Sequence, residues 1–176
     1  MGTRMSASPG LRRAVPADAA ALAQLRYAFR STLGSAVENE LDFLARTERW
    51  LDERLRTTAW LAWLAAAPTT GVIGQCYLQV IEKIPNPVGE AEWIGYVTNV
   101  FVKPEWRGRG IASSLIDLAL DHCNKQGAFS VILWPTDESR SLYVRNGFVT
   151  PQRLMEFPCS TTMPSTQKTC NGLPNA

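Results

Sequence analysis

The stretch from Trp93 to Gln126 constrains the fold of this chain more than any other segment. A long β-type run ends at Val102, Pro104 stops it, and a glycine-containing turn opens directly into an amphipathic helix expected over 110–126. Apolar side chains share one side of that helix, and small or polar side chains share the other. A strand that leads at once into a helix with one apolar face predicts a fold in which helices pack on a sheet.

Strand and helix patterns also alternate along the rest of the chain. The pattern predicts strands at 11–15, 60–66, 71–83, 93–102, 129–134 and 148–157. It predicts further helices after Asp18, at 38–55 and at 138–146. Because one hairpin interrupts the alternation near Pro68 and Gly71, the sheet should be of mixed direction, in an α/β (α+β) fold.

A chain of 176 residues is long enough for about one domain with its own core. We expect a flexible arm at 1–10, a single domain at 11–159 and a disordered tail at 160–176. The tail consists mostly of Ser, Thr, Pro, Asn and other small or polar residues, with few large apolar ones. Such a segment cannot bury enough surface to offset the entropy of ordering.

Charge and cysteine usage exclude several classes of protein. The net charge of +2 is too small to drive nucleic-acid binding. A single His122, and cysteines without C-x-x-C spacing, give no zinc or redox motif, so we expect no metal. The cysteines are Cys76, Cys123, Cys159 and Cys170.

No stretch of the sequence resembles a signal peptide or a membrane span. The longest apolar run, at 59–68, has about half the length that a membrane span needs. We therefore expect a cytoplasmic protein with reduced thiols that does not bind membranes.

The turn before the helix has the composition of an anion site. Gly108 and Gly110 lack a β-carbon, so an anion can approach the backbone, and Arg107 and Arg109 add positive charge. The first amides of the helix, from Ile111, Ala112 and Ser113, have no partner within the helix and point outward. Pyrophosphate fits such a site. The sequence contains neither a Rossmann fingerprint before a first helix nor a Walker loop.

Three segments together resemble the GNAT superfamily of N-acetyltransferases. The motif R-x-x-G-x-A at Arg107, Gly110 and Ala112 resembles its pyrophosphate-binding motif, and the segment 141–148 (SLYVRNGF) resembles its late L-Y-x-x-x-G-F signature. The segment 11–18 (LRRAVPAD), followed by an Ala/Leu helix, resembles its opening strand and helix. The resemblance covers about residues 11–157.

This resemblance implies a fold and a cosubstrate. The fold is a mixed, mostly antiparallel central sheet of six or seven strands, flanked by about four helices, with splayed central strands. The cosubstrate is acetyl-CoA, without a metal. The resemblance implies that the backbone of Val100, Phe101 and Val102 binds the pantetheine arm of acetyl-CoA. In the superfamily, the strand at this place carries a bulge. The resemblance assigns the pyrophosphate to Arg107, Gly108, Arg109, Gly110, Ile111, Ala112 and Ser113.

Tyr143 is the candidate general acid, because a phenol can protonate the CoA thiolate as it leaves. The general base is less well defined by the sequence. Glu92, at the start of the strand at 93–102, is a candidate, directly or through water, but its spacing does not compel the role. Positions nearer the centre of that strand carry no acid, which leaves deprotonation through ordered water open.

The expected function is transfer of an acetyl group to an amine, and the acceptor stays open. Acids that lie in segments bordering the acceptor side in the superfamily favour a small cationic amine over a protein N-terminus or lysine. These acids are Glu38, Glu40, Asp42, Glu82, Glu90 and Glu92. A CoA-binding sensor or interaction module without catalytic activity is the alternative, and the sequence is compatible with a homodimer.

Overall fold

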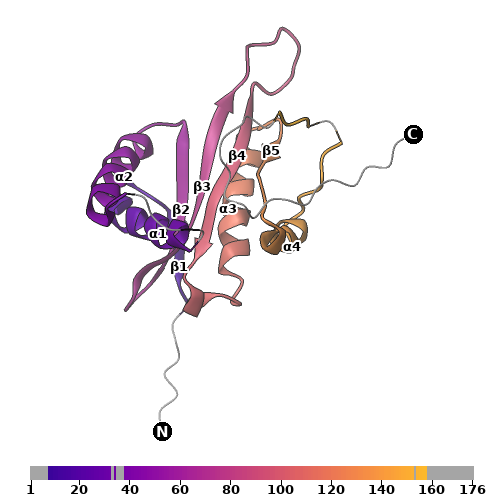
Figure 1. Cartoon of the computed structure of the whole chain (residues 1–176). Helices are drawn as coiled ribbons and strands as arrows, with labels where there is room; N and C mark the ends of the chain where they lie inside the picture. The colour runs from indigo at the N-terminus through magenta and orange to yellow at the C-terminus, as the bar shows by residue number, and fades with distance from the viewer. Residues whose placement is uncertain (1–7, 33, 35–37, 153, 158–176) are drawn as a thin grey trace.

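The structure, a computed structural model, describes residues 8–32, 34, 38–152 and 154–157, and its five strands form one sheet (Figure 1). Their spatial order follows the chain: β1 (Gly10–Arg13), β2 (Trp60–Ala67), β3 (Gly71–Glu82), β4 (Trp93–Val102) and β5 (Val131–Ile132). The pairs from β1 to β4 are antiparallel, and β5 is parallel to β4. The sheet is therefore mixed and mostly antiparallel, as expected.

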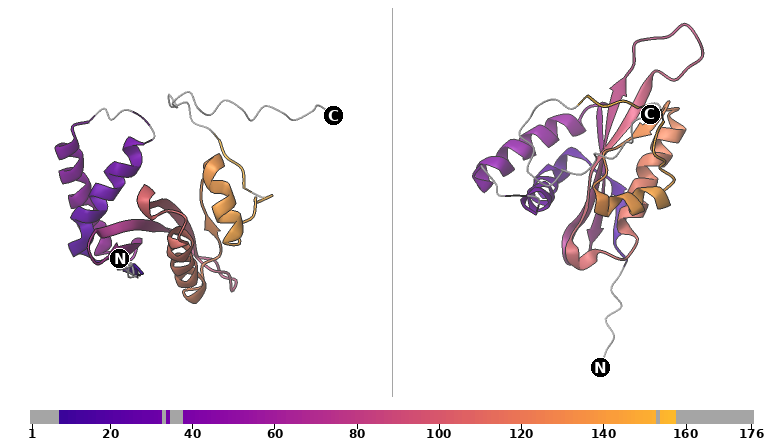
Figure 2. Two further views of the ribbon diagram at one scale, coloured as in Figure 1. Left: turned by 90° about the horizontal axis from the view of Figure 1, so that it is seen from below. Right: turned by 45° about the vertical axis from the view of Figure 1, so that its right-hand side comes forward.

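Four α-helices flank this sheet in the part of the chain that the structure describes. The helices α1 (Ala19–Ser31) and α2 (Glu40–Leu55) lie on one side, and α3 (Ile111–Lys125) lies on the other, with α4 (Asp137–Arg145) beyond β5 (Figure 2). The crossover from β4 to its parallel neighbour β5 runs through α3, as a parallel pair requires.

Local sequence signals explain where two of these helices begin. The Asn39 side chain accepts a hydrogen bond from the Leu41 amide at 2.9 Å and caps α2. Thr136 and Ser139 bond reciprocally at the start of α4. The two caps satisfy amides that have no partner within their own helix.

Apolar side chains fill the space on both faces of the sheet. On the α3 face, Leu115 and Ala119 pack against Leu78 and Val97 of the strands. On the other face, buried side chains of α1 and α2 pack against β2 and β3. The sheet is thus the middle layer of three, and its central strands are buried on both sides.

The strands β4 and β5 separate after a short paired stretch. Their pairing consists of Gly95 with Val131 and Tyr96 with Ile132. From Val97 to Val102, no strand within the described residues pairs with this edge of β4. The expected splay of the central strands is therefore present, and it leaves backbone groups of β4 without a strand partner on that side.

A bulge interrupts β4 where the splay begins. Tyr77 pairs with Thr98 and Gln75 pairs with Phe101, so β4 has one residue more than β3 in this interval. Asn99 lies there with a φ of 53°, a left-handed conformation that Asn adopts more readily than most residues. The bulge that the family resemblance implied is thus part of this chain.

The strand count and the C-terminal strand expectations need correction. The sheet has five strands rather than six or seven within the described residues. The strand expected at 129–134 shrinks to Val131–Ile132, and the described residues of 148–157 form no strand. In this last segment Val149, Met155 and Phe157 are strongly exposed, so its apolar side chains have no face to bury and do not hold a strand in the sheet.

The other boundaries differ from the expected ones by one or two residues. The strand β1 begins at Gly10, one residue before the expected domain start, and α2 begins at Glu40 rather than at residue 38. The expectations for most of the arm and for the tail at 160–176 lie outside the described residues. None of the described helices has the length and apolarity needed to cross a bilayer.

Candidate active site

The turn between β4 and α3 leaves a row of backbone groups open to solvent. A short 3₁₀ segment, Pro104–Trp106, follows the strand, and Gly108 and Gly110 then adopt φ values of 74° and 76°. A β-carbon built at either glycine would meet nothing within 4 Å. The turn therefore has open space exactly on the side where a side chain would project.

The first amides of α3 are available to a ligand. Gly110 precedes the helix, and no side chain within the described residues caps it. The amides of Ile111, Ala112 and Ser113 therefore have no cap and lie at the positive end of the helix dipole. The side chain of Ile111 is buried in the core, so its amide alone faces the site.

The two arginines of the turn carry positive charge without a neighbouring carboxylate. Arg107 donates from Nε to the Val102 carbonyl at 3.0 Å, which fixes its side chain against the end of β4. The Arg109 guanidinium lies 4.7 Å from the centre of the Trp106 ring. Neither arginine forms an ion pair within the described ranges, so both can contribute charge to an anion at the turn.

The strand β4 leads from this turn to the bulge. Phe101 and Val102 are buried, and the half-buried Val100 packs against the α3-side core. Their side chains therefore stabilise the fold, while their backbone lies along the stretch of β4 that has no strand partner on the splayed side. The part that the family resemblance gives to the backbone of these residues, binding of the pantetheine arm, stays a prediction.

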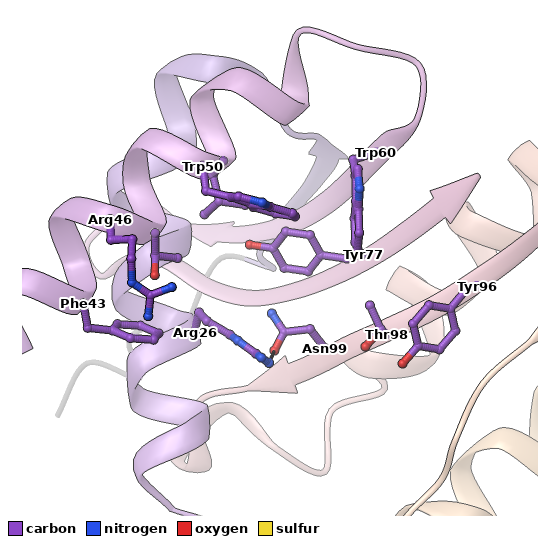
Figure 3. A pocket seen from close by; sticks show the side chains of 11 residues that line it. Arg26, Phe43, Arg46, Trp50, Trp60, Tyr77, Tyr96, Thr98 and Asn99 are labelled. Atoms are coloured by element: carbon purple, nitrogen blue, oxygen red, sulfur yellow. Dashed lines mark hydrogen bonds between the residues drawn. The ribbon is translucent and has the colours of Figure 1, made fainter. Parts of the chain in front are cut away.

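A contact from α1 holds the bulge in place. Arg26 donates from Nη1 to Oδ1 of Asn99 at 2.8 Å, across 73 positions of sequence (Figure 3). The bond joins a side chain of α1 to Asn99, the one residue of β4 with a left-handed conformation. The position of α1 is therefore coupled directly to the shape of β4.

A pocket of about 440 Å³ opens beside the bulge on the α1–α2 side of the sheet. Thr98, Asn99 and Tyr96 reach it from β4, and Arg26 reaches it from α1 (Figure 3). Its other lining residues are Phe43, Arg46, Thr47, Trp50, Leu51, Trp60 and Tyr77. The volume is within the range of small-molecule sites in proteins.

Tyr143 lies on the other side of the splayed strands, on α4. It is half-buried, and its ring packs edge-on against Phe148 at 5.7 Å. Burial, with smaller contributions from Cys76 and Tyr96, raises the pKa of Tyr143 to about 12. The phenol therefore stays protonated at neutral pH.

Asn146 connects the Tyr143 helix to the turn. Its Nδ2 donates to the Ser113 Oγ at 3.2 Å and to the Leu142 carbonyl at 2.7 Å. Ser113 belongs to the first turn of α3, whose amides are candidate pyrophosphate ligands. The two motifs that lie 36 residues apart in the sequence, from Arg107 to Tyr143, are therefore in direct contact.

The structure does not bring Glu92 to this site. Glu92 is exposed, precedes β4, and accepts a hydrogen bond from the Asn86 amide at 3.1 Å. Seven residues of extended chain separate it from Asn99, which is roughly 20 Å at the rise of a strand. It does not line the pocket.

The acids that favoured a cationic acceptor are also absent from the pocket lining. Glu38 pairs with Arg46 at 2.6 Å, and Glu90 pairs with Lys83 at 3.3 Å. The structure therefore removes the reason, drawn from the sequence, for preferring a cationic acceptor.

Several pocket residues carried no signal in the sequence. Arg26 looks like an ordinary polar position of an amphipathic helix, and Asn99 looks like a strand residue next to the turn. The preference of Asn for left-handed backbone was the one available hint of a bulge. Trp50 and Trp60 also line the pocket.

Comparisons with known proteins agree with this fold. The sequence matches the family model of the Acetyltransferase (GNAT) family over residues 23–148. The chain therefore belongs to the GNAT acetyltransferase family.

Two curated relatives are similar in sequence to part of this chain. A glucosamine 6-phosphate N-acetyltransferase of Trypanosoma brucei brucei is 30% identical over 51% of this chain and 59% of its own length. An aminoglycoside N(6')-acetyltransferase type 1 of Stenotrophomonas maltophilia is 27% identical over 64% of this chain and 65% of its own length. The matches thus span less than two thirds of both relatives.

A solved structure shows the same fold over almost its whole length. It is a predicted acetyltransferase of Clostridium acetobutylicum, solved with acetyl-CoA, with a TM-score of 0.68 and 21% identity. The similarity covers 85% of this chain and 96% of that one. The arrangement of sheet and helices described above is therefore the fold of GNAT acetyltransferases.

Proposed function

We propose that this protein transfers an acetyl group from acetyl-CoA to a primary amine, in a complex that holds both substrates at once. One observation carries the proposal: the anion-binding turn, the unpaired edge of β4 and the bulge follow one another along a single strand. A pocket adjoins the bulge on one side of the sheet, and Tyr143 approaches the splayed strands on the other.

Acetyl-CoA would lie along the splayed edge of β4. Its pyrophosphate would accept hydrogen bonds from the amides of Ile111, Ala112 and Ser113, with charge from Arg107 and Arg109. Its pantetheine arm would pair with the backbone of Val100 to Val102 as a strand does, since this edge has backbone groups to offer. The thioester would then reach the bulge next to the pocket.

The reaction would proceed by direct attack. The amine nitrogen forms a bond to the thioester carbon, and the carbonyl oxygen gains negative charge that a backbone amide near Val100 stabilises. The tetrahedral intermediate then breaks its carbon–sulfur bond, and the departing sulfur takes a proton from the Tyr143 hydroxyl. A pKa of about 12 keeps the Tyr143 phenol protonated at neutral pH, so the hydroxyl has a proton to donate.

The amine must lose a proton before or during the attack. Glu92 is too far from the bulge to accept this proton directly. We infer that the proton leaves through water in the pocket. Glu92 could then receive it only through a chain of several water molecules.

A small-molecule acceptor fits the pocket better than a protein chain. The pocket has the size of a metabolite site, and five aromatic side chains form much of its lining. The two curated relatives are named for small amines, a phosphorylated amino sugar and the aminoglycosides. These names support the class of acceptor without identifying it.

Acetylation of a broad panel of amines, with acetyl-CoA as donor, tests the proposal. The panel should contain amino acids, amino sugars, simple alkylamines and short peptides. Release of free CoA thiol together with an acetylated amine, detected by mass spectrometry, is the expected result. Binding of acetyl-CoA without any product across the panel would contradict the proposal and would favour a CoA-binding module.

A further inference from the structure

The pocket beside the bulge has positive charge and no negative charge in its lining. Arg26 and Arg46 are its charged residues, and no Asp or Glu lines it. A site built for a cationic amine would be expected to contain a carboxylate. The charge of this pocket points to a different kind of acceptor.

Arg26 is a half-buried cation without a carboxylate partner. Its identified hydrogen-bond partner is Asn99, a neutral amide, and it forms no ion pair in the described part of the chain. All 16 Asp and Glu residues of the sequence lie in the described ranges, so none is hidden elsewhere. Burial, and then repulsion from Arg30, hold the pKa of Arg26 below its usual value. The native protein thus keeps an uncompensated guanidinium at the pocket.

Arg26 lines the pocket and has donors that its bond to Asn99 does not use. A guanidinium has several N–H groups in one plane, and Asn99 uses the Nη1 side. The other groups can form paired hydrogen bonds with a carboxylate or a phosphate. Figure 3 shows the guanidinium of Arg26 between α1 and β4, next to Asn99.

Of the two arginines, Arg46 is the less available for binding an anion. Glu38 holds it through two hydrogen bonds, at 2.6 and 3.1 Å, and its side chain is largely exposed. Its charge is therefore mostly compensated already, and solvent screens the remainder. Arg26 is the residue that an anionic group would engage first.

The walls of the pocket favour an apolar or ring-containing body. Trp50 and Trp60 pack edge-to-face with ring centres 5.0 Å apart, and Tyr77 lies beside them (Figure 3). The Tyr77 hydroxyl already donates to the Gln75 Oε1 at 3.3 Å, so the ring presents mainly its apolar surface. Such rings bind flat or apolar groups by contact and burial.

We propose that the acceptor is an amine that also carries an anionic group, a carboxylate or a phosphate, which Arg26 binds beside the bulge. This inference rests on the proposed acetyl transfer, because it names the acceptor class for the same site. Arg26 would be a specificity-determining residue, which orients the acceptor by its anionic group while the amine faces the thioester.

Matched pairs of ligands test the proposal by binding alone. 3-Phenylpropionate and phenylphosphate are the anionic probes, and phenethylamine and 3-phenylpropanamide are cationic and neutral probes of similar size. Binding to the CoA-loaded protein is followed by fluorescence of the pocket tryptophans and by calorimetry. We expect an anionic probe to bind about tenfold to a hundredfold more tightly than the neutral one, the range of one charge-assisted contact. The two anionic probes also distinguish a carboxylate from a phosphate site.

Variants then assign the preference to Arg26. Arg26→Gln removes the charge but keeps a donor for Asn99, and it should abolish the preference for the anionic probe. Arg26→Lys should retain part of the preference. Arg30→Gln is the matched control, because it removes a neighbouring exposed charge of α1 outside the pocket lining and should leave the preference intact.

The results separate this inference from the proposed function. If the cationic or neutral probe binds as tightly as both anionic probes in the unmodified protein, the inference is overturned, whether or not the variants fold. Equal loss of preference in Arg26→Gln and Arg30→Gln would also overturn it. In either case, acetylation of neutral or cationic amines in the panel would leave the proposed acetyl transfer standing. An absence of acetyl transfer together with a clear anionic preference would instead contradict the proposed function alone.

Discussion

Among single residues, Tyr143 and Glu92 illustrate how position decides a chemical role. Both have side chains that can exchange a proton. Tyr143 is half-buried on α4, and burial raises its pKa to about 12. Glu92 is exposed and bonded to the Asn86 amide at the far end of β4. We propose that the tyrosine, and not the glutamate, acts on the thioester at the bulge.

Tyr143→Phe should lower kcat by about 100-fold and change the Kd for acetyl-CoA by less than about twofold. The substitution keeps the ring and its packing on Phe148 and removes only the hydroxyl, which is needed chiefly in the transition state. Steady-state kinetics and calorimetry measure the two quantities. Tyr27→Phe is the control, because it removes a hydroxyl outside the pocket lining. A near-normal kcat in Tyr143→Phe would make the tyrosine structural.

The pH dependence of kcat tests the pKa of Tyr143 in its role as general acid. A general acid works only while protonated, so its contribution is lost as the pH rises through its pKa. An unperturbed phenol loses its proton near pH 10, whereas the raised pKa of Tyr143 moves this loss to about pH 12. We therefore expect no fall in kcat between about pH 8 and pH 10. A decline in this range that disappears in Tyr143→Phe would show that the Tyr143 hydroxyl loses its proton there, which contradicts the raised pKa but not the role of Tyr143 as the acid.

At the scale of elements, β4 serves both the core and the site. Its side chains at Phe101 and Val102 are buried, while its backbone on the splayed side is open to a ligand. The bulge at Asn99 allows this double use, because it changes the pairing with β3 just where the partner β5 has ended. Arg26 of α1 then ties the bulge to the pocket.

Gly110→Val should weaken acetyl-CoA binding at least tenfold from a micromolar Kd. The new side chain would project into the open space where the pyrophosphate is expected. Gly127→Val, at the other end of α3, is a matched control: its φ of 68° and its open surroundings are alike, so the strain of about 1–2 kcal/mol is shared. Calorimetry should show the loss of affinity in the first variant alone. Equal affinities in the two variants would contradict the assignment of the turn.

Substitutions of Asn99 test the bulge itself. Asn99→Gly keeps the positive φ and loses only the bond to Arg26, so acetyl-CoA binding should stay near that of the unmodified protein. Asn99→Val places a branched side chain in a left-handed conformation, at a cost of about 1–2 kcal/mol, and should lower both Tm and kcat. Thermal melting and kinetics compare the two. An Asn99→Val protein with unchanged kcat would show that the bulge is dispensable.

For the whole molecule, the family and the turn before α3 could be predicted from the sequence, but the pocket could not. The strand at 93–102 and the glycine-containing start of α3 are local features, written in consecutive residues, and the structure confirms them. The pocket joins Arg26 and Trp50 to Thr98 across distant segments, and no local pattern encodes such a contact. The strand predicted at 148–157 was wrong. Its apolar residues suggested a strand, but a strand in a sheet also needs a neighbouring strand and a buried face.

Removal of residues 160–176 should leave the folded domain nearly unchanged. The composition of this segment gives it little apolar surface to bury. We expect a change in unfolding free energy below about 0.5 kcal/mol, or roughly 2 °C in Tm, and an unaltered Kd for acetyl-CoA. Thermal melting and calorimetry of the truncated chain measure both. A loss of several degrees would mean that the segment packs on the domain or across a dimer.

A crystal structure of the acetyl-CoA complex would show where this protein holds its cosubstrate. We expect pyrophosphate oxygens within about 3.2 Å of the amide nitrogens of Ile111, Ala112 and Ser113. We also expect the thioester carbonyl at the bulge near Val100, with the sulfur facing the Tyr143 hydroxyl. Pyrophosphate bound away from the turn, or a sulfur atom on the side of β4 remote from Tyr143, would contradict the proposed binding mode.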